Sequence, residues 1–433
     1  MARLAGNMIM QRRFKFFSLT SFFILCFFRQ AAALEALEWK DCLREAAKNH
    51  PDLIAAEEEV KQSEARRKIT ASALFPQINS SLNASTARTD TGKSDSIADT
   101  YNYGLIGTQL IFDGIKTISN VNAAAENIKA AKENFSFTSS TVRFRLRTAF
   151  IDLLRAQEML RITREIYAIR RGNLELITLR YESGLEHKGA LLAAEADLSQ
   201  AGYEISQVER GLEVVQRELT KEMGRTKLTP VEAKGDFTVI DAARDKPDFE
   251  ALAKDNPSLQ QLIAQKNAAQ FGVKSAYANF SPTLTGSAGA NKSGSRWSPR
   301  NDQWNLGLTL SMPIFEGGLR FAQVSQAKAL LNQLRENERS GKDSLVLSLE
   351  QAWAGLQDTL DYVNVQQKQL AAAEERSEIA QAQYSTGFMT FDNWTIIQDN
   401  LVKAKKAFLD AQANGLFAEA GLIQAKGETL EYE

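Results

Sequence analysis

The sequence predicts a membrane protein of mixed α/β class, mainly α, in which two tandem repeats each supply two transmembrane β-strands and long coiled-coil-like helices. Three observations predict this class. Short motifs recur at an offset of 203 to 206 residues, and long stretches without proline carry apolar residues at heptad spacing. Four short segments also alternate apolar and polar residues, as half-buried strands do.

The first 33 residues have the features of a secretory signal peptide. Arg12, Arg13 and Lys15 precede an apolar run over residues 16–28, and three alanines follow at 31–33. Removing residues 1–33 takes away five basic and no acidic side chains, so the formal net charge falls from −1 to −6. An acidic chain is a poor candidate for nucleic-acid binding, so we expect no nucleic-acid partner.

The repeat sets the domain organisation. His50-Pro51-Asp52-Leu53 matches Asn256-Pro257-Ser258-Leu259, and Ile111-Phe112-Asp113-Gly114 matches Ile314-Phe315-Glu316-Gly317. We expect one short strand in the linker, over residues 234–240. The predicted units are a first repeat at 34–224 (helix 51–74, strands 77–88 and 101–112, helices 115–180 and 188–224), an equatorial linker at 225–248, a second repeat at 249–427 (helix 257–279, strands 282–291 and 303–314, helices 317–383 and 391–426) and a tail at 428–433.

The long helices carry a coiled-coil pattern. Val142, Leu146, Ala149 and Leu153 follow a 4-3-4 spacing, and apolar or small residues stand 203 positions further on. A period near 3.5 indicates helices that pack side by side over their whole length.

The four predicted strands have the length of transmembrane strands, about 9–11 residues. Leu306, Leu308 and Leu310 alternate with polar or small residues, which suits a wall between lipid and water. Tyr101, Tyr103 and Trp304 are candidates for an aromatic girdle contacting outer-membrane lipid. Four strands cannot close a barrel, and an open edge is not tolerated in lipid. The chain must therefore share a barrel with copies of itself; two copies give eight strands and three give twelve.

Two further segments are closely alike, RYESGLEHKG at 180–189 and QYSTGFMTFD at 383–392. Each contains Tyr-x-x-Gly followed by an apolar residue, and each lies between two long helical stretches. Glycine can take the left-handed backbone at the end of a helix, so both segments are predicted turns of long helical hairpins. The matching residues are Tyr181, Gly184, Leu185, Tyr384, Gly387 and Phe388.

Together, the repeat, the Phe-Asp/Glu-Gly turns and the Tyr-x-x-Gly tips resemble the TolC family of outer-membrane efflux proteins over about residues 36–427. The resemblance implies a homotrimer with a 12-stranded β-barrel in the outer membrane of a Gram-negative bacterium, continued by a 12-helix tube in the periplasm. It implies a passive duct fed by an inner-membrane pump of RND or ABC type through a periplasmic adaptor. The six tip residues would then serve adaptor docking, and the tips would gate the duct.

The best-known family member closes its entrance with aspartates held by tyrosine–arginine contacts. In this chain Ala190, Asn393 and Ile396 occupy the aspartate positions and Met389 the arginine position. We therefore expect a more apolar closure here, through Phe388, Met389 and Phe391. Gate residues particular to this chain are then Phe388, Met389, Phe391, Asp392 and Asn393.

Other functional classes find little support. Two histidines far apart and one cysteine after the signal peptide make no metal site, and no phosphate-binding loop or catalytic constellation is present. We expect no enzyme, no cofactor and no metal. Two alternatives remain: the outer-membrane duct of a type I protein secretion system, and a soluble periplasmic coiled-coil adaptor, which would lack the strand pairs.

Overall fold

The computed structural model describes residues 35–90, 92, 95–237 and 246–430. The predicted signal peptide therefore lies outside the described residues. In chain order the elements are β1 (Glu35–Glu38), α1 (Trp39–Asn49), α2 (Pro51–Ser72), β2 (Gln77–Asp90), β3 (Asp95–Phe112), α3 (Lys116–Glu182), α4 (Lys188–Glu222), β4 (Val231–Lys234), α5 (Phe249–Lys254), α6 (Pro257–Ala278), β5 (Thr283–Gly294), β6 (Asn301–Ser311), α7 (Leu319–Ser385) and α8 (Phe391–Lys426).

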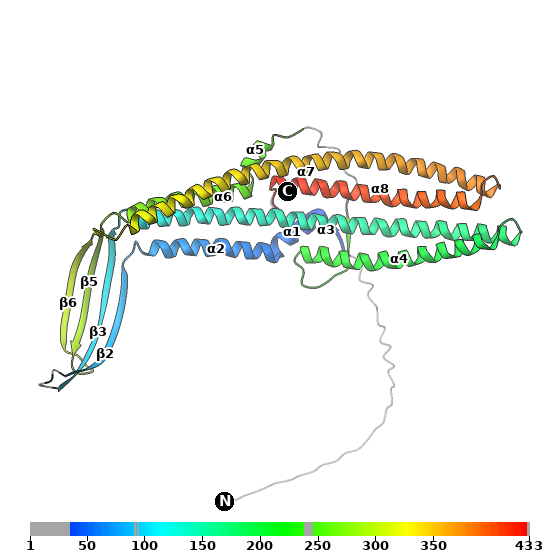
Figure 1. The fold of residues 1–433 in the computed structure, drawn as a ribbon. Helices are drawn as coiled ribbons and strands as arrows, with labels where there is room; N and C mark the ends of the chain where they lie inside the picture. Colours follow the sequence, from blue (N-terminus) through cyan, green and yellow to red (C-terminus); the bar gives the residue numbers. More distant parts are fainter. Residues whose placement is uncertain (1–34, 91, 93–94, 238–245, 431–433) are drawn as a thin grey trace, which may run out of the picture.

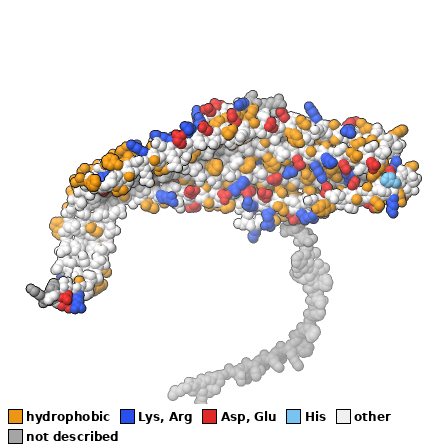
Figure 2. All heavy atoms as spheres, in the orientation of Figure 1, with side chains coloured by type: hydrophobic (Ala, Val, Ile, Leu, Met, Phe, Trp, Pro, Cys, Tyr) orange, Lys and Arg blue, Asp and Glu red, His pale blue; other side chains and the backbone are white. Residues whose placement is uncertain are grey.

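The helices form one elongated layer, and the sheet extends from one end of it (Figure 1). Charged side chains cover the helical layer, whereas on the visible face of the sheet they gather at the end away from the helices (Figure 2). The helices α3 and α7 each have 67 residues and run the length of the layer. In Figure 1, α2 and α4 follow one another along α3, and α6 and α8 follow one another along α7. Because α3 also contacts α6 and α8, the layer has four columns, in the order α2 with α4, α3, α6 with α8, and α7.

The short helices α2 and α6 begin in the same way. Each has proline in its first turn, where the missing N–H would have no partner inside the helix. The preceding residue caps the helix: the His50 Nδ1 accepts a hydrogen bond from the Asp52 N–H, and the Asn256 Oδ1 accepts one from the Ser258 N–H.

A compact apolar core lies in the middle of the first repeat. It combines Leu37, Cys42 and Leu43 near the start of the chain with Leu146 and Phe150 of α3. The parallel pair β1–β4 covers this core. At its edge, two residues after the end of α4, the backbone of Gly224 lies against Asn49 and His50. Here the columns α2 and α4 meet end to end.

The second sheet is antiparallel, with the strand order β2-β3-β5-β6. Paired residues on neighbouring strands share a face, so the register sorts the side chains into two faces. One, the apolar face, carries Ile78, Leu82, Leu105, Trp304, Leu306 and Leu308. The other, the polar face, carries Asn79, Ser81, Asn102, Ser287, Asn305 and Thr309.

Some elements differ from the sequence prediction. β2 extends to Asp90 and β3 begins at Asp95. Most of the residues between the predicted strands 77–88 and 101–112, which were expected to form a loop, therefore belong to the sheet. The residues in this stretch are mostly short and polar, but β2 and β3 stay in register there and remain paired up to Asp90 and Asp95. The linker strand is β4 at Val231–Lys234 rather than 234–240, and of that range residues 238–240 lie outside the described part. β1 and α5 were not predicted because four and six residues are too short to show a period. The helix α1 was also not predicted, although Cys42, Leu43 and Ala46 form its buried face.

No helix within the described residues is long and apolar enough to cross a membrane.

The end-to-end junction gives a first prediction, for Gly224→Ala. Gly224 has φ +80°, and an added Cβ would lie 2.4 Å from the Asn49 carbonyl oxygen. Left-handed backbone costs alanine about 1–2 kcal/mol, and overpacking adds roughly 1–3 kcal/mol. We expect Gly224→Ala to lower the midpoint of thermal unfolding, followed by circular dichroism, more than Gly184→Ala does. Gly184 is the matched control because it has φ +73° but nothing within 4 Å of an added Cβ. Equal midpoints for the two variants would contradict a close junction.

Candidate functional site

The two hairpin tips have the same backbone turn. In the first tip the Leu185 N–H donates to the Arg180 carbonyl and the Gly184 N–H donates to the Tyr181 carbonyl, at 2.8 and 3.0 Å. In the second tip, 203 residues later, Phe388 and Gly387 repeat both bonds, at 2.8 and 3.1 Å. Both glycines have positive φ, at 73° and 83°, as the Schellman turn requires.

The side chains around the two turns differ sharply. Tyr384 of the second tip is fully buried, whereas Tyr181 of the first tip is 37% exposed. The Tyr384 ring stacks on Trp394 of α8, with centroids 4.4 Å apart and planes 6° from parallel. The Trp394 indole N–H donates to the Gln381 Oε1 at 3.0 Å. We name the buried set around this stack the tip cluster: Ile177, Ala190, Ala194, Ala380, Tyr384 and Trp394.

Charged residues of the first hairpin complete the tip cluster. The Arg180 guanidinium lies over the Tyr384 ring, 4.8 Å from its centroid, and also donates to the Tyr384 carbonyl at 3.2 Å. The Tyr384 hydroxyl donates to the Glu186 Oε2 at 2.8 Å, and Arg180 Nε lies 4.0 Å from the same oxygen. Arg180, Glu186 and Tyr384 therefore join the two hairpins, and we name these three residues the tip latch.

The surroundings of Tyr384 keep its hydroxyl a donor. Burial raises the pKa of Tyr384 above its ordinary value, and both the hydrogen bond to Glu186 and the negative charge of that carboxylate raise it further. The phenol thus stays protonated through the physiological range. A hydrogen bond from a neutral hydroxyl to a carboxylate is stronger than one between neutral groups.

This geometry changes the expected roles of several tip residues. Tyr384, predicted to dock an adaptor, has no exposed surface in the protomer, and its docking role stays a prediction. Met389 and Phe391, expected to close the gate, pack partly buried against the tip cluster. Asp392 and Asn393 are exposed, as are Leu185 at 67% and Phe388 at 88%. A docking or gating role for these exposed residues, and for Tyr181 and the two glycines, stays a prediction.

Three important residues were missed from the sequence: Arg180, Glu186 and Trp394. The sequence did indicate Arg180 and Glu186, because the corresponding positions of the second segment hold the uncharged residues Gln383 and Met389. Charges unique to one of two otherwise similar tips indicate a contact between them. Ala190, at the position of a family aspartate, is fully buried, where a carboxylate would lose its hydration.

Ion pairs continue the contact between hairpins away from the tips. Arg170 of α3 bridges Asp197 of α4 and Asp399 of α8. Further along, the Arg155 guanidinium lies 2.6 Å from the Asp410 carboxylate. Burial and the nearby Asp399 carboxylate raise the pKa of Asp197, although Arg170 opposes this. Ion pairs thus alternate with apolar contacts, such as that of Ile162 and Ile166 with Leu409, along the contact between hairpins.

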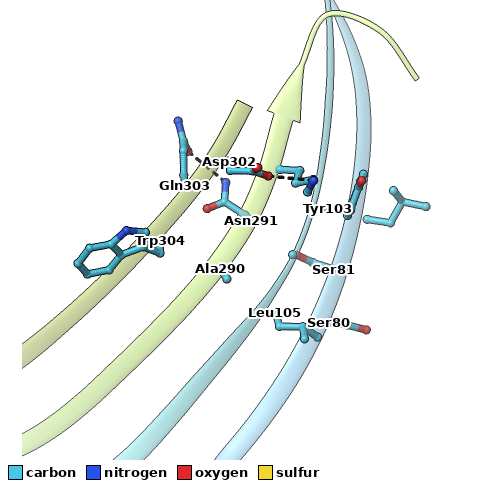
Figure 3. Close-up of a pocket in the computed structure, with 12 residues that line it drawn as sticks. Ser80, Ser81, Tyr103, Leu105, Ala290, Asn291, Asp302, Gln303 and Trp304 are labelled. Atoms are coloured by element: carbon cyan, nitrogen blue, oxygen red, sulfur yellow. Dashed lines mark hydrogen bonds and ion pairs between the residues drawn. The ribbon is translucent and has the colours of Figure 1, made fainter. Parts of the chain in front are cut away.

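The sheet is the second candidate site, and it bears the predicted girdle residues. Tyr101, Tyr103 and Trp304 all lie on the apolar face, with Trp304 81% exposed. Large side chains of β3 and β6 flank Ala290 of β5 and leave a shallow groove (Figure 3). At its outer end Lys292 pairs with Asp302 at 3.1 Å. An aromatic row followed by charges is the order expected where lipid meets water.

Several known proteins resemble this chain in sequence. The family described as outer membrane efflux protein matches residues 42–225 and 250–428. The outer membrane efflux protein BepC of Brucella suis is 25% identical over 409 residues, which cover 92% of this chain and 86% of BepC. The pyoverdine export outer membrane protein OpmQ of Pseudomonas aeruginosa is 24% identical, over 91% of this chain and 86% of OpmQ. The alkaline protease secretion protein AprF of the same organism is 24% identical, over 77% of this chain and 79% of AprF.

Solved structures share the fold. CusC superposes with a TM-score of 0.81 at 18% identity, over 89% of this chain and 91% of CusC. The outer membrane protein VceC of Vibrio cholerae gives a TM-score of 0.77 at 18% identity, over 90% of this chain and 96% of VceC.

The tip latch gives a second prediction, for Tyr384→Phe. This change removes the hydroxyl that donates to Glu186 and keeps the stack on Trp394. A hydrogen bond to a charged group contributes roughly 1.5–3 kcal/mol, so the opening equilibrium of the tip should rise about 10- to 100-fold. Amide hydrogen exchange over residues 380–394 measures this.

Tyr181→Phe is the matched control, because among the described residues the Tyr181 hydroxyl makes no polar contact. It should leave exchange at both tips unchanged. Equal exchange in the two variants would show that the hydroxyl of Tyr384 does not hold the tips together.

Proposed function

The chain belongs to the outer membrane efflux protein family, and from this premise we propose that three copies form one passive export duct, with a barrel in the outer membrane and a helical tube in the periplasm. The duct has no catalytic step. Its substrates come from an inner-membrane pump through a periplasmic adaptor, and the hairpin tips form its gate.

The observation that carries this proposal is that both layers of the protomer end in open edges. In the sheet, β2 and β6 each have a partner on one side only. In the helical layer the outer columns expose large apolar side chains: Ile69, Tyr203 and Val214 on α2 and α4, and Leu347, Tyr362 and Ile379 on α7. The two sides differ, so one copy offers its β6–α7 side to the β2–α2/α4 side of the next. Head-to-tail contacts form a closed ring when the rotation between successive copies closes.

Closure in lipid also favours three copies. Unpaired backbone groups at β2 and β6 would each cost several kcal/mol in hydrocarbon. Pairing β6 of one copy with β2 of the next removes both edges. Two copies would give an eight-stranded barrel, and side chains fill the interior of a barrel of that size. Three copies would give twelve strands and a wider lumen. The apolar face would then meet lipid and the polar face would line the lumen, with Tyr101, Tyr103 and Trp304 as the girdle.

We infer that the tip latch holds the gate closed, in place of the apolar closure expected from the sequence. Arg180 and Glu186 come from the first hairpin and Tyr384 from the second, so separating the hairpins breaks their contacts. Met389 and Phe391 pack inside the protomer instead. Exposed Leu185 and Phe388, with Tyr181, Gly184 and Gly387, are proposed to form the adaptor-docking surface.

Efflux of small molecules is favoured by BepC and OpmQ, whose names describe efflux and export. Protein secretion by a type I system stays the second candidate, because AprF is named for secretion of an alkaline protease. The genes next to this one would separate the two, since one system requires an RND-type or ABC-type drug pump and the other an exporter with a protein substrate.

The oligomer gives a third prediction. Protein extracted from membranes in mild detergent should have three times the protomer mass, measured by size-exclusion chromatography with light scattering. Intersubunit cross-linking should yield products of two and three chains and none larger. A monodisperse monomer, or recovery in the soluble periplasmic fraction, would reject the duct.

The gate gives a fourth prediction. In planar bilayers the double variant Arg180→Gln with Tyr384→Phe should conduct more than wild type, because it removes the polar contacts of the tip latch and places at position 180 the glutamine that the second tip carries at 383. Tyr181→Phe should conduct as wild type does.

The apolar closure is tested in the same bilayers with Phe388→Ala combined with Met389→Ala. If the tip latch alone holds the gate, this variant conducts as wild type does. Raised conductance in this variant, together with unchanged conductance in the latch variant, would reverse the assignment.

A further inference from the structure

The polar face of the sheet carries no charged side chain on any of the four strands as the structure describes them. Six strand residues are charged: Arg88, Asp90, Asp95, Asp99, Lys292 and Asp302. The strand register puts all six on the apolar face, on the hairpin side of the row that contains Trp304. The polar face instead carries serine, threonine, asparagine, glutamine and small residues, together with Ile106 and Leu110 of β3.

Membrane insertion does not account for this distribution. A charge on the lipid face of a barrel costs about 2–4 kcal/mol at the bilayer midplane, whereas a lumen-facing charge is solvated. A barrel can thus hold charges inside its lumen at little cost, and rings of such charges set ion selectivity in channels. In this chain the lumen positions are free to hold charges, but neutral residues such as Ser81, Ser287 and Asn305 occupy them.

We propose that the strand part of the duct is a charge-neutral outlet lined by hydroxyl and amide groups, which passes solutes of either charge sign and adds no ion selectivity. This inference rests on the proposed function, because it requires the polar face to line a lumen. Hydroxyl and amide groups both donate and accept hydrogen bonds, so they solvate cations, anions and neutral polar solutes alike. The outlet therefore suits an exporter whose substrates differ in charge, and any discrimination falls to the helical tube or the pump.

Hydrogen bonds across the polar face support a fixed, neutral wall. Asn291 of β5 donates to Gln303 of β6 at 3.1 Å, next to the ion pair of Lys292 and Asp302 (Figure 3). The amide pair lies on the polar face, and the ion pair lies on the apolar face. Adjacent residues on the same two strands thus carry neutral partners on one face and charged partners on the other.

The test places a charge in the middle of the polar face. Ser287 pairs with Thr108 and Gly307, so three copies of Ser287→Asp or Ser287→Lys would put three like charges at one level of the lumen. In bilayers under a potassium chloride gradient we expect the reversal potential to shift toward cation selectivity for Ser287→Asp and toward anion selectivity for Ser287→Lys. The neutral variant Ser287→Asn is the control for folding, and Asp302→Asn, on the apolar face, should cause no shift.

The outcomes separate the outlet from the duct. A conducting trimer in which neither Ser287 variant shifts the reversal potential, or in which Asp302→Asn does, overturns the neutral outlet and leaves the duct in place. The absence of any conducting trimer rejects both proposals.

A block measurement tests neutrality in the wild type itself. Hexaamminecobalt(III) or ferricyanide, added on the side of the strand hairpins, should not reduce the wild-type current at concentrations at which the cation blocks Ser287→Asp and the anion blocks Ser287→Lys. Block of the wild type by either ion at those concentrations would overturn the proposal.

Discussion

The contact of α3 with the second repeat is the interaction on which the protomer depends. α3 makes the largest helical contribution to this contact because it packs against both α6 and α8, while the pairing of β3 with β5 and the ion pair of Lys406 on α8 with Glu204 on α4 add to it. The nature of this contact changes along its length. Near the middle of the layer it is apolar, with Ile151 against Leu416 and Ala420, and Ile162 and Ile166 against Leu409. Closer to the tips, ion pairs such as Arg170 with Asp399 take over.

The apolar contacts near the middle of the layer and the ion pairs nearer the tips differ in strength. A buried aliphatic side chain contributes about 1.5–3 kcal/mol, whereas an exposed ion pair contributes about 0.2–1 kcal/mol. The hairpins are thus firmly joined in the middle and weakly joined below it, where the tip cluster is the main remaining contact. The stack of Tyr384 on Trp394 lies within the second hairpin and survives separation. Separation breaks the hydrogen bond to Glu186, the contacts of Arg180, and the packing of the stack against Ile177, Ala190 and Ala194 of the first hairpin.

Periodicity and duplication made much of this fold predictable, since long helices and alternating strands repeat a pattern over many residues. The helix starts at Pro51 and Pro257 and the glycine turns at the tips depend only on a few neighbouring residues, so the sequence alone predicts them. The short elements β1, α1 and α5 could not be predicted because tertiary contacts, such as the burial of Cys42 and Phe249, stabilise them. The tip latch was missed for a related reason. The similarity of the two segments suggested equal roles for Tyr181 and Tyr384. The burial of a tyrosine depends, however, on which helix packs against it, and only Tyr384 contacts Arg180 and Glu186.

The two tips therefore show how one duplicated turn acquires two roles. The Schellman geometry needs only glycine and the backbone, so it is the same in both. The residues flanking it are free to diverge. Arg180 and Glu186 of the first tip contact Tyr384, which is fully buried, whereas Tyr181 of the first tip is 37% exposed. A duplicated hairpin can thus hold its own protomer together with one tip and leave the other for contacts outside it, without any change in the turn itself.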